Sequence, residues 1–146
     1  MINTVGKVVT LFVSIPNTKK KLEKESIQLD TKGIIEDKFY NKDINRSVLI
    51  TSLESYSLVE KENITMPYGA LGENLLLDYN PYHLSPGSKL KIGSTILEIS
   101  QHCTICDHLS VIDKKVPEIL KKDRGIFAKV LQKGEIKKGD SILLLA

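Results

Sequence analysis

The chain has 146 residues, of which 41% are hydrophobic and 27% are charged. This length and composition suit one globular domain with its own core and exclude a disordered chain. The formal net charge of +3 comes with scattered short lysine runs. There is no arginine-rich stripe with interleaved aromatic residues, so we expect no nucleic-acid partner.

The apolar stretches are short, and the longest of them lies near residues 8–13. A membrane-spanning helix needs ~20 apolar residues, so we expect no membrane segment. The N-terminus also lacks the basic segment, apolar core and cleavage site of a secretion signal. The two cysteines, Cys103 and Cys106, are three positions apart, and a disulfide between them closes too small a loop to staple a fold. We therefore expect a cytoplasmic protein with reduced thiols.

The first half of the chain predicts three strands and a helix. The apolar and β-branched run at residues 5–15 reads as a strand, and the alternating run at 26–29 reads as a second. A third strand is expected at 46–50. Serine and threonine at 51–52, followed by Glu54, form a helix start, so a helix should run towards Lys61.

The second half predicts mostly strands separated by glycine turns. A glycine-rich loop at 67–74 leads into an apolar strand at 75–77, and residues 87–99 form a hairpin that turns at Gly93-Ser94. The remaining expected elements are a helical stretch over 104–122 with Pro117 in a first turn, a strand at 125–131, a turn at Lys133-Gly134 and a strand at 141–145.

The order of these elements predicts the fold class. Short strands at regular spacing with glycine turns favour a mainly β fold, a closed or nearly closed β-barrel that carries a few peripheral helices. No linker-like segment interrupts the chain, so residues 1–146 should form a single domain.

The densest group of reactive side chains lies in the segment from His102 to His108, which contains both cysteines. Four interpretations stay open. Both thiolates with a histidine could hold zinc, although a closed structural site needs four ligands and no second ligand pair follows. The Cys-x-x-Cys pair could be a redox dithiol. One cysteine could act alone as a thiolate, or both could simply pack as small apolar side chains.

Two further features are candidates for ligand binding. The glycines in the loop Gly69 to Asn74 let backbone amides approach a ligand, and Glu73 and Asn74 add polar side chains. Arg46 and Arg124 are the only arginines of a lysine-rich chain, which suggests that a planar, two-pronged guanidinium is needed at these places to bind an anion.

Taken together, these segments resemble the ordered signature of MOSC domains, the C-terminal domains of molybdenum-cofactor sulfurases, which also occur alone and in amidoxime-reducing enzymes. The most specific part is the turn Gly72-Glu73-Asn74. The segments that carry the resemblance are Gly33 to Asp37, Arg46 to Ile50, Gly69 to Leu75, the hairpin Gly87 to Ile99 with a cysteine after it, Arg124 to Leu131, Gly134 and Gly139-Asp140.

The resemblance implies a MOSC-like barrel that binds the molybdenum cofactor, molybdopterin. Cys106, with Leu109 three positions on, matches the family's cysteine and would be the molybdenum ligand or a persulfide carrier. Arg46 and Arg124 would hold the cofactor's phosphate or pterin. Gly72, Glu73 and Asn74 would complete the cofactor site. The chain departs from the family at His102-Cys103, where proline and arginine are common, and at Glu36, where glycine is common.

The resemblance also implies partners. Sulfurases carry a separate pyridoxal-phosphate domain, for which this chain has no room, so no pyridoxal phosphate is expected here. Sulfur would come from a sulfur donor such as a cysteine desulfurase. A small reductase for N-hydroxylated compounds would instead need an electron-transfer partner and a small-molecule substrate. The alternative from another class is a non-catalytic module whose Cys103-Cys106 pair holds zinc or acts as a redox dithiol.

Overall fold

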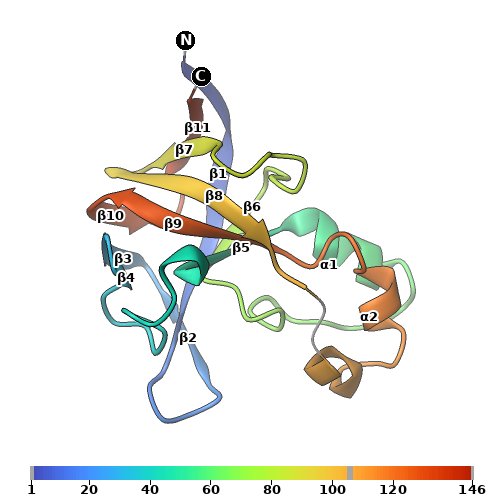
Figure 1. The fold of residues 1–146 in the computed structure, drawn as a ribbon. Coiled ribbons are helices and arrows are strands. Elements are labelled where there is room, and N and C mark those ends of the chain that lie inside the picture. Colours follow the sequence, from blue (N-terminus) through green and yellow to red (C-terminus); the bar gives the residue numbers. More distant parts are fainter. Residues whose placement is uncertain (1, 105–106, 146) are drawn as a thin grey trace.

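The computed structural model describes residues 2–104 and 107–145, and its strands form a closed barrel (Figure 1). Seven of the described strands close the barrel in the order β1, β11, β7, β8, β9, β5 and β6, with β6 returning to β1. All neighbours are antiparallel except β5 and β6. These strands are β1 (Ile2–Ser14), β5 (Val48–Ser52), β6 (Leu75–Leu77), β7 (Lys89–Ile92), β8 (Thr95–His102), β9 (Ile126–Gln132) and β11 (Ser141–Leu145). The predicted mainly β barrel is confirmed.

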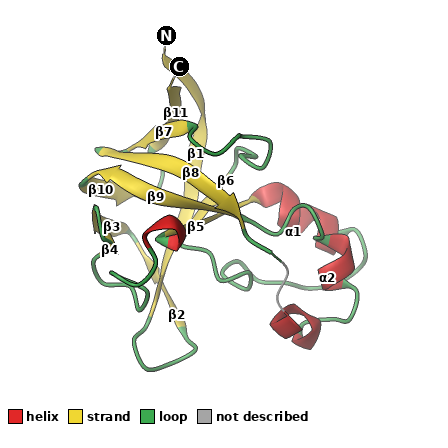
Figure 2. Cartoon of the chain, viewed as in Figure 1, coloured by secondary structure: helices red, strands yellow, loops and turns green. Residues whose placement is uncertain are grey.

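The remaining elements lie around this barrel (Figure 2). They are β2 (Lys21–Lys24), β3 (Ser26–Asp30), β4 (Gly33–Ile34), β10 (Gly134–Lys137), the helices α1 (Leu53–Glu60) and α2 (Val116–Ile119), and the short 3-10 helices η1 (Ile44–Arg46) and η2 (Asp107–Val111). Strand β2 extends the sheet beyond β1, while β10, β3 and β4 make a small second sheet. None of the helices in the described ranges is long and apolar enough to cross a membrane.

Alternation along the strands decides which side chains fill the barrel. In β5, Val48 and Ile50 belong to the main buried cluster inside the barrel, so Leu49 between them points to the outer face. Leu49 pairs directly with Phe127 of β9, which points outward with it. The outer wall between β5 and β9 is therefore apolar, and this wall carries the site described below.

Helix α1 forms where its capping sequence predicts. The Ser52 side chain accepts a hydrogen bond from the Glu54 amide at 3.1 Å, and the helix ends at Glu60. The helix belongs to the crossover that a parallel pair such as β5 and β6 requires. A second buried cluster, which includes Tyr56, Val59 and Leu76, lies under α1 and α2.

Two local expectations were wrong, and one strand was not foreseen. From residue 107 on, η2 is followed by the single turn α2, which has Pro117 in its first turn as expected but ends at Ile119 and not near Lys122. No turn forms at Lys133-Gly134, because Gly134 begins β10, which pairs with β3. Strand β2 was not foreseen, since its sequence Lys-Leu-Glu-Lys is mostly charged and reads as a solvated turn.

Gly93, in the turn between β7 and β8, gives a test of the barrel's construction. Its φ is +60°, and a Cβ here would collide with the Glu135 carbonyl oxygen, a backbone atom that cannot rotate away. Gly93→Ala should lower the free energy of unfolding by about 2–3 kcal/mol, measured by chemical denaturation. Gly139→Ala is the matched control, because Gly139 also has a positive φ of +89° but nothing within 4 Å. Equal losses in the two variants would show that close packing at Gly93 does not matter.

Candidate functional site

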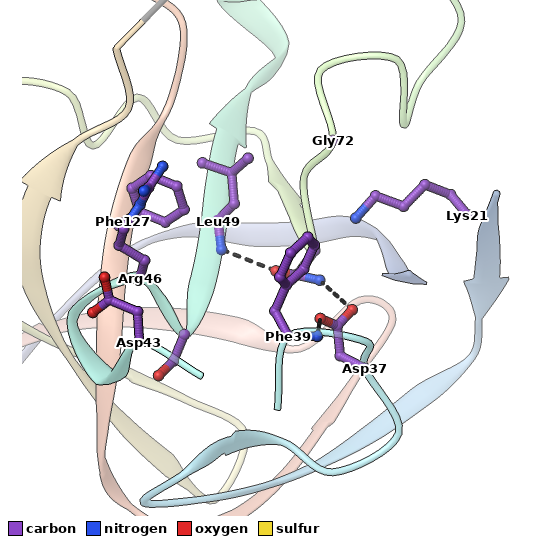
Figure 3. A pocket seen from close by; sticks show the side chains of 10 residues that line it. Lys21, Asp37, Phe39, Asp43, Arg46, Leu49, Gly72 and Phe127 are labelled. Atoms are coloured by element: carbon purple, nitrogen blue, oxygen red, sulfur yellow. Dashed lines mark hydrogen bonds between the residues drawn. The ribbon is translucent and has the colours of Figure 1, made fainter. Parts of the chain in front are cut away.

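A pocket of about 230 Å³ lies against the outer wall of the barrel where β5 meets β9 (Figure 3). Five parts of the chain line it: β2, the loop at 35–43, η1 with the start of β5, the glycine loop at 69–74, and β9. These parts are far apart in sequence, and only the barrel's closure brings them to one place. The segments Arg46 to Ile50 and Gly69 to Leu75 from the family signature meet here.

The floor and one side of the pocket are apolar and aromatic. Leu49 and Phe127 form the wall, and the exposed ring of Phe39 lines the pocket too. The Arg46 guanidinium lies 4.8 Å from the centroid of the Phe127 ring, in a cation–π contact. Buried Cys103 packs in the same cluster as Leu49 and Phe127, so the pocket wall contacts the beginning of the cysteine segment.

Gly72 opens the pocket on the side of the glycine loop. Its φ is +84°, a conformation that L side chains rarely adopt, and a Cβ there would meet only the Leu49 Cδ2 at 3.9 Å. A ligand in the pocket can therefore approach the backbone closely at this position.

Asn74 holds three of the lining segments together through its side chain. Its Oδ1 accepts a hydrogen bond from the Leu49 amide at 3.0 Å, and its Nδ2 donates to the Phe12 carbonyl and to Asp37, each at 3.2 Å. The side chain is only 5% exposed. Its amide is thus already bonded within the protein, and Asn74 shapes the pocket from its base.

Asp37 is the buried carboxylate of the pocket. Its Oδ1 accepts from the Ser14 amide at 2.6 Å as well as from Asn74, and its Oδ2 accepts from the Phe39 amide at 2.9 Å. These bonds anchor the loop that carries Phe39 to β1. Asp37 is the last residue of the family-signature segment Gly33 to Asp37, but the sequence alone indicated no role for it.

Glu73 points away from the pocket, into the protein, and is completely buried. Its Oε2 accepts hydrogen bonds from the Thr51 hydroxyl at 2.9 Å and from the Tyr56 hydroxyl, while its Oε1 has no partner among the described residues. Burial and the neighbouring carboxylate raise the pKa of Tyr56 far above its ordinary range. The Tyr56 hydroxyl in turn accepts from the Gly69 amide at 3.1 Å, so this network fixes the glycine loop from behind.

Arg124 does not line the pocket. It lies just before β9, where the Gly125 carbonyl accepts a hydrogen bond from the Cys103 amide at 2.9 Å, so it is beside the start of the cysteine segment. Its side chain is 3% exposed, and its Nε and Nη1 find no acceptor in the described part of the chain. A buried guanidinium with unpaired donors is suited to an anion.

The cysteine proposed as the functional thiol, Cys106, lies outside the described residues. His102 is exposed at the end of β8. Among the side chains that the structure describes, which exclude those of residues 105–108, no group of three or more His, Cys, Asp or Glu is arranged to hold a metal ion. Both roles expected for Cys106, molybdenum ligand and persulfide carrier, stay predictions.

The structure therefore gathers some of the expected site residues and not others. Arg46, Gly72 and Asn74 line one pocket, whereas Glu73 lies behind it and Arg124 beside the cysteine segment. A common anion for Arg46 and Arg124 stays a prediction. Sequence analysis missed Lys21, Phe39 and Phe127. No local signal marks Lys21, which ends a run of three lysines, and Phe39 and Phe127 stand in no pattern that indicates a ligand site.

The fold defines a small β-barrel with a pocket on its outer wall. A family model described as the MOSC domain matches residues 36–143, so the chain belongs to the MOSC domain family. A search of curated proteins gave no match.

Solved structures share the fold. The YuaD protein from Bacillus subtilis superimposes with a TM-score of 0.84 at 15% identity, over 100% of this chain and 99% of that one. YiiM from Geobacillus stearothermophilus gives a TM-score of 0.73 at 17% identity, over 100% of this chain and 76% of that one. YiiM from Escherichia coli gives 0.69 at 15% identity, over 96% and 70%. At these identities the likeness concerns the fold alone.

Asn74→Ala tests whether this side chain holds the site together. The change leaves the buried Leu49 amide and the Phe12 carbonyl without a side-chain partner, so the free energy of unfolding should fall by about 3 kcal/mol in chemical denaturation. Asn45→Ala is the control, because Asn45 is exposed and its loss should cost less than about 0.5 kcal/mol. A similarly small loss of unfolding free energy in both variants would show that Asn74 does not hold the site together.

Proposed function

We propose that this MOSC domain binds the molybdenum cofactor, with part of the cofactor in the pocket between β5, β9 and the glycine loop, and with Cys106 at the metal. One observation carries the proposal. The pocket is built from the segments that mark the family, and its apolar wall contacts Cys103, three positions before Cys106. Three residues of chain span at most about 11 Å. A thiolate at position 106 is therefore within reach of a ligand that fills the pocket.

The size and lining of the pocket suit one end of such a ligand. Its volume of about 230 Å³ is below the ~300–1,000 Å³ of pockets that enclose a whole small molecule. It therefore takes one ring system and leaves the rest of the ligand outside, towards the cysteine segment. Arg46 over Phe127, together with Phe39, offers flat surfaces against which a pterin ring can stack.

Arg124 gives a separate indication that the site suits an anionic cofactor. Its Nε and Nη1 are buried without a partner among the described residues, and its backbone lies next to the start of the cysteine segment, so an anionic group of the cofactor would satisfy them. Glu73 acts indirectly, because its bond with Tyr56 fixes the loop that presents Gly72. Arg46 in the pocket and Arg124 beside it are both proposed to bind the cofactor, and Asn74 keeps the pocket in shape.

The bound cofactor supplies redox chemistry at molybdenum or accepts and donates sulfur. A soft cysteine thiolate at position 106 suits both, as a metal ligand or as the carrier of a persulfide. In the first case the protein reduces a small N-hydroxylated substrate with electrons from a partner protein. In the second it receives sulfur from a donor such as a cysteine desulfurase. Both assign the function to a reduced thiol in the cytoplasm.

Metal and pterin analysis of the protein purified from cells grown with molybdate tests the proposal. The parent should carry molybdenum together with a fluorescent pterin, and Cys106→Ser should lose molybdenum while its circular dichroism stays unchanged. Mass spectrometry of Cys106 then separates the two activities, because a carrier shows a persulfide there.

Cys103→Ala is the control, since it keeps an apolar atom at a buried position and should retain molybdenum and pterin. Stoichiometric zinc without pterin, lost equally in both cysteine variants, would contradict the proposal and establish the Cys-x-x-Cys zinc module instead.

A further inference from the structure

The first residue of β2, Lys21, differs from the two lysines that precede it. Lys19 and Lys20 are exposed in the loop before the strand, whereas Lys21 is half-buried and lines the pocket. It pairs with Ser14 of β1, and its side chain reaches towards the pocket from the side opposite Arg46 (Figure 3). The pocket therefore has a cation on each side, with the aromatic wall beneath Arg46.

The two carboxylates of the pocket already accept hydrogen bonds from the protein's own backbone amides. Asp37 accepts from the amides of Ser14 and Phe39. Asp43 caps η1, and its side chain accepts from the Asn45 amide at 3.1 Å. Both carboxylates thus hold loops in place, Asp37 through both of its oxygens and Asp43 through Oδ1.

The two cations are not balanced in this way. Neither Lys21 nor Arg46 forms an ion pair with a carboxylate in the described part of the chain. The contact that Arg46 does make is with the Phe127 ring. The positive charges are consequently the groups of this pocket that are available to a ligand.

The surroundings of Lys21 also favour the binding of an anion. Burial lowers the pKa of Lys21 below the ordinary 10.5, because the ammonium is partly removed from water. Asp37 and Glu73 raise the pKa in part, and Lys38 lowers it. A partly desolvated ammonium without a direct ion pair binds an incoming anion more strongly than an exposed lysine does.

We propose that Lys21 is the oxyanion-binding residue of this pocket and holds a phosphate-type group of the ligand from the side opposite Arg46. The identity of that ligand rests on the proposed function, but the oxyanion site does not. The group has two possible sources with the same chemistry: the phosphate of the molybdenum cofactor, or a phosphate carried by the substrate.

Titration of the cofactor-free protein with inorganic phosphate tests the site, with the lysine Nζ signals followed by NMR. The Lys21 signal should titrate below the ordinary lysine pKa of 10.5, and phosphate should shift the signal and raise the pKa of Lys21. Lys21→Met should weaken phosphate binding about tenfold or more. Lys20→Met, a neighbouring exposed lysine, should leave binding unchanged.

The pH profile separates a charge role from a packing role. In the parent, phosphate binding should decline as the pH rises through the lowered pKa of Lys21, because the neutral amine no longer attracts the anion. Lys21→Arg keeps the charge at every accessible pH, so it should retain binding and extend it to higher pH. Phosphate affinity in Lys21→Met equal to that of the parent, or a pH profile unchanged by Lys21→Arg, would overturn the assignment.

The source of the phosphate follows from cofactor content. If Lys21→Met purifies with less molybdenum and pterin, Lys21 holds the cofactor's phosphate. If cofactor content is unchanged while phosphate binding is lost, Lys21 holds a substrate phosphate. Both results support the oxyanion site. If the parent purifies without cofactor and still binds phosphate at Lys21, the proposed function is wrong but the oxyanion site is supported.

Discussion

The side-chain amide of Asn74 connects β5, β1 and the loop of Asp37, three segments that no local sequence rule brings together. Its backbone continues the same connection, since its amide donates to the Leu49 carbonyl and its carbonyl accepts from the Phe12 amide, each at 2.8 Å. Because all these groups are buried, an unmade bond would cost far more than a made bond contributes. The pocket therefore exists as a rigid shape before any ligand arrives.

This internal bonding also determines which charges a ligand meets. The carboxylates of Asp37 and Asp43 are used to hold loops in place, and Glu73 fixes the glycine loop through Tyr56. The cations Lys21 and Arg46 are left facing the pocket. A preformed pocket of this kind would bind the proposed anionic, partly aromatic ligand without first ordering its own side chains. The same internal hydrogen bonds thus determine both the shape of the pocket and the charges that face a ligand.

The barrel was predictable because its signals are local. The apolar run of β1, the serine cap of α1 and the glycine turn at Gly93 each act within a few residues. Pairings between distant segments were not, so β2 was missed: its charged sequence becomes a strand only because β1 offers it an edge. For the same reason Arg46, Gly72 and Asn74 could be named from motifs, whereas Lys21 could be found only from the fold.

In the proposed complex, the molybdenum cofactor occupies the pocket on the β5–β9 wall and its metal lies at Cys106. Crystals of the protein purified from molybdate-grown cells, measured at the molybdenum absorption edge, test this arrangement most directly. We predict an anomalous peak bonded to the Cys106 sulfur, with continuous density running from it into the pocket between Arg46 and Gly72. An anomalous peak away from Cys106, or a cofactor bound with this pocket empty, would contradict it.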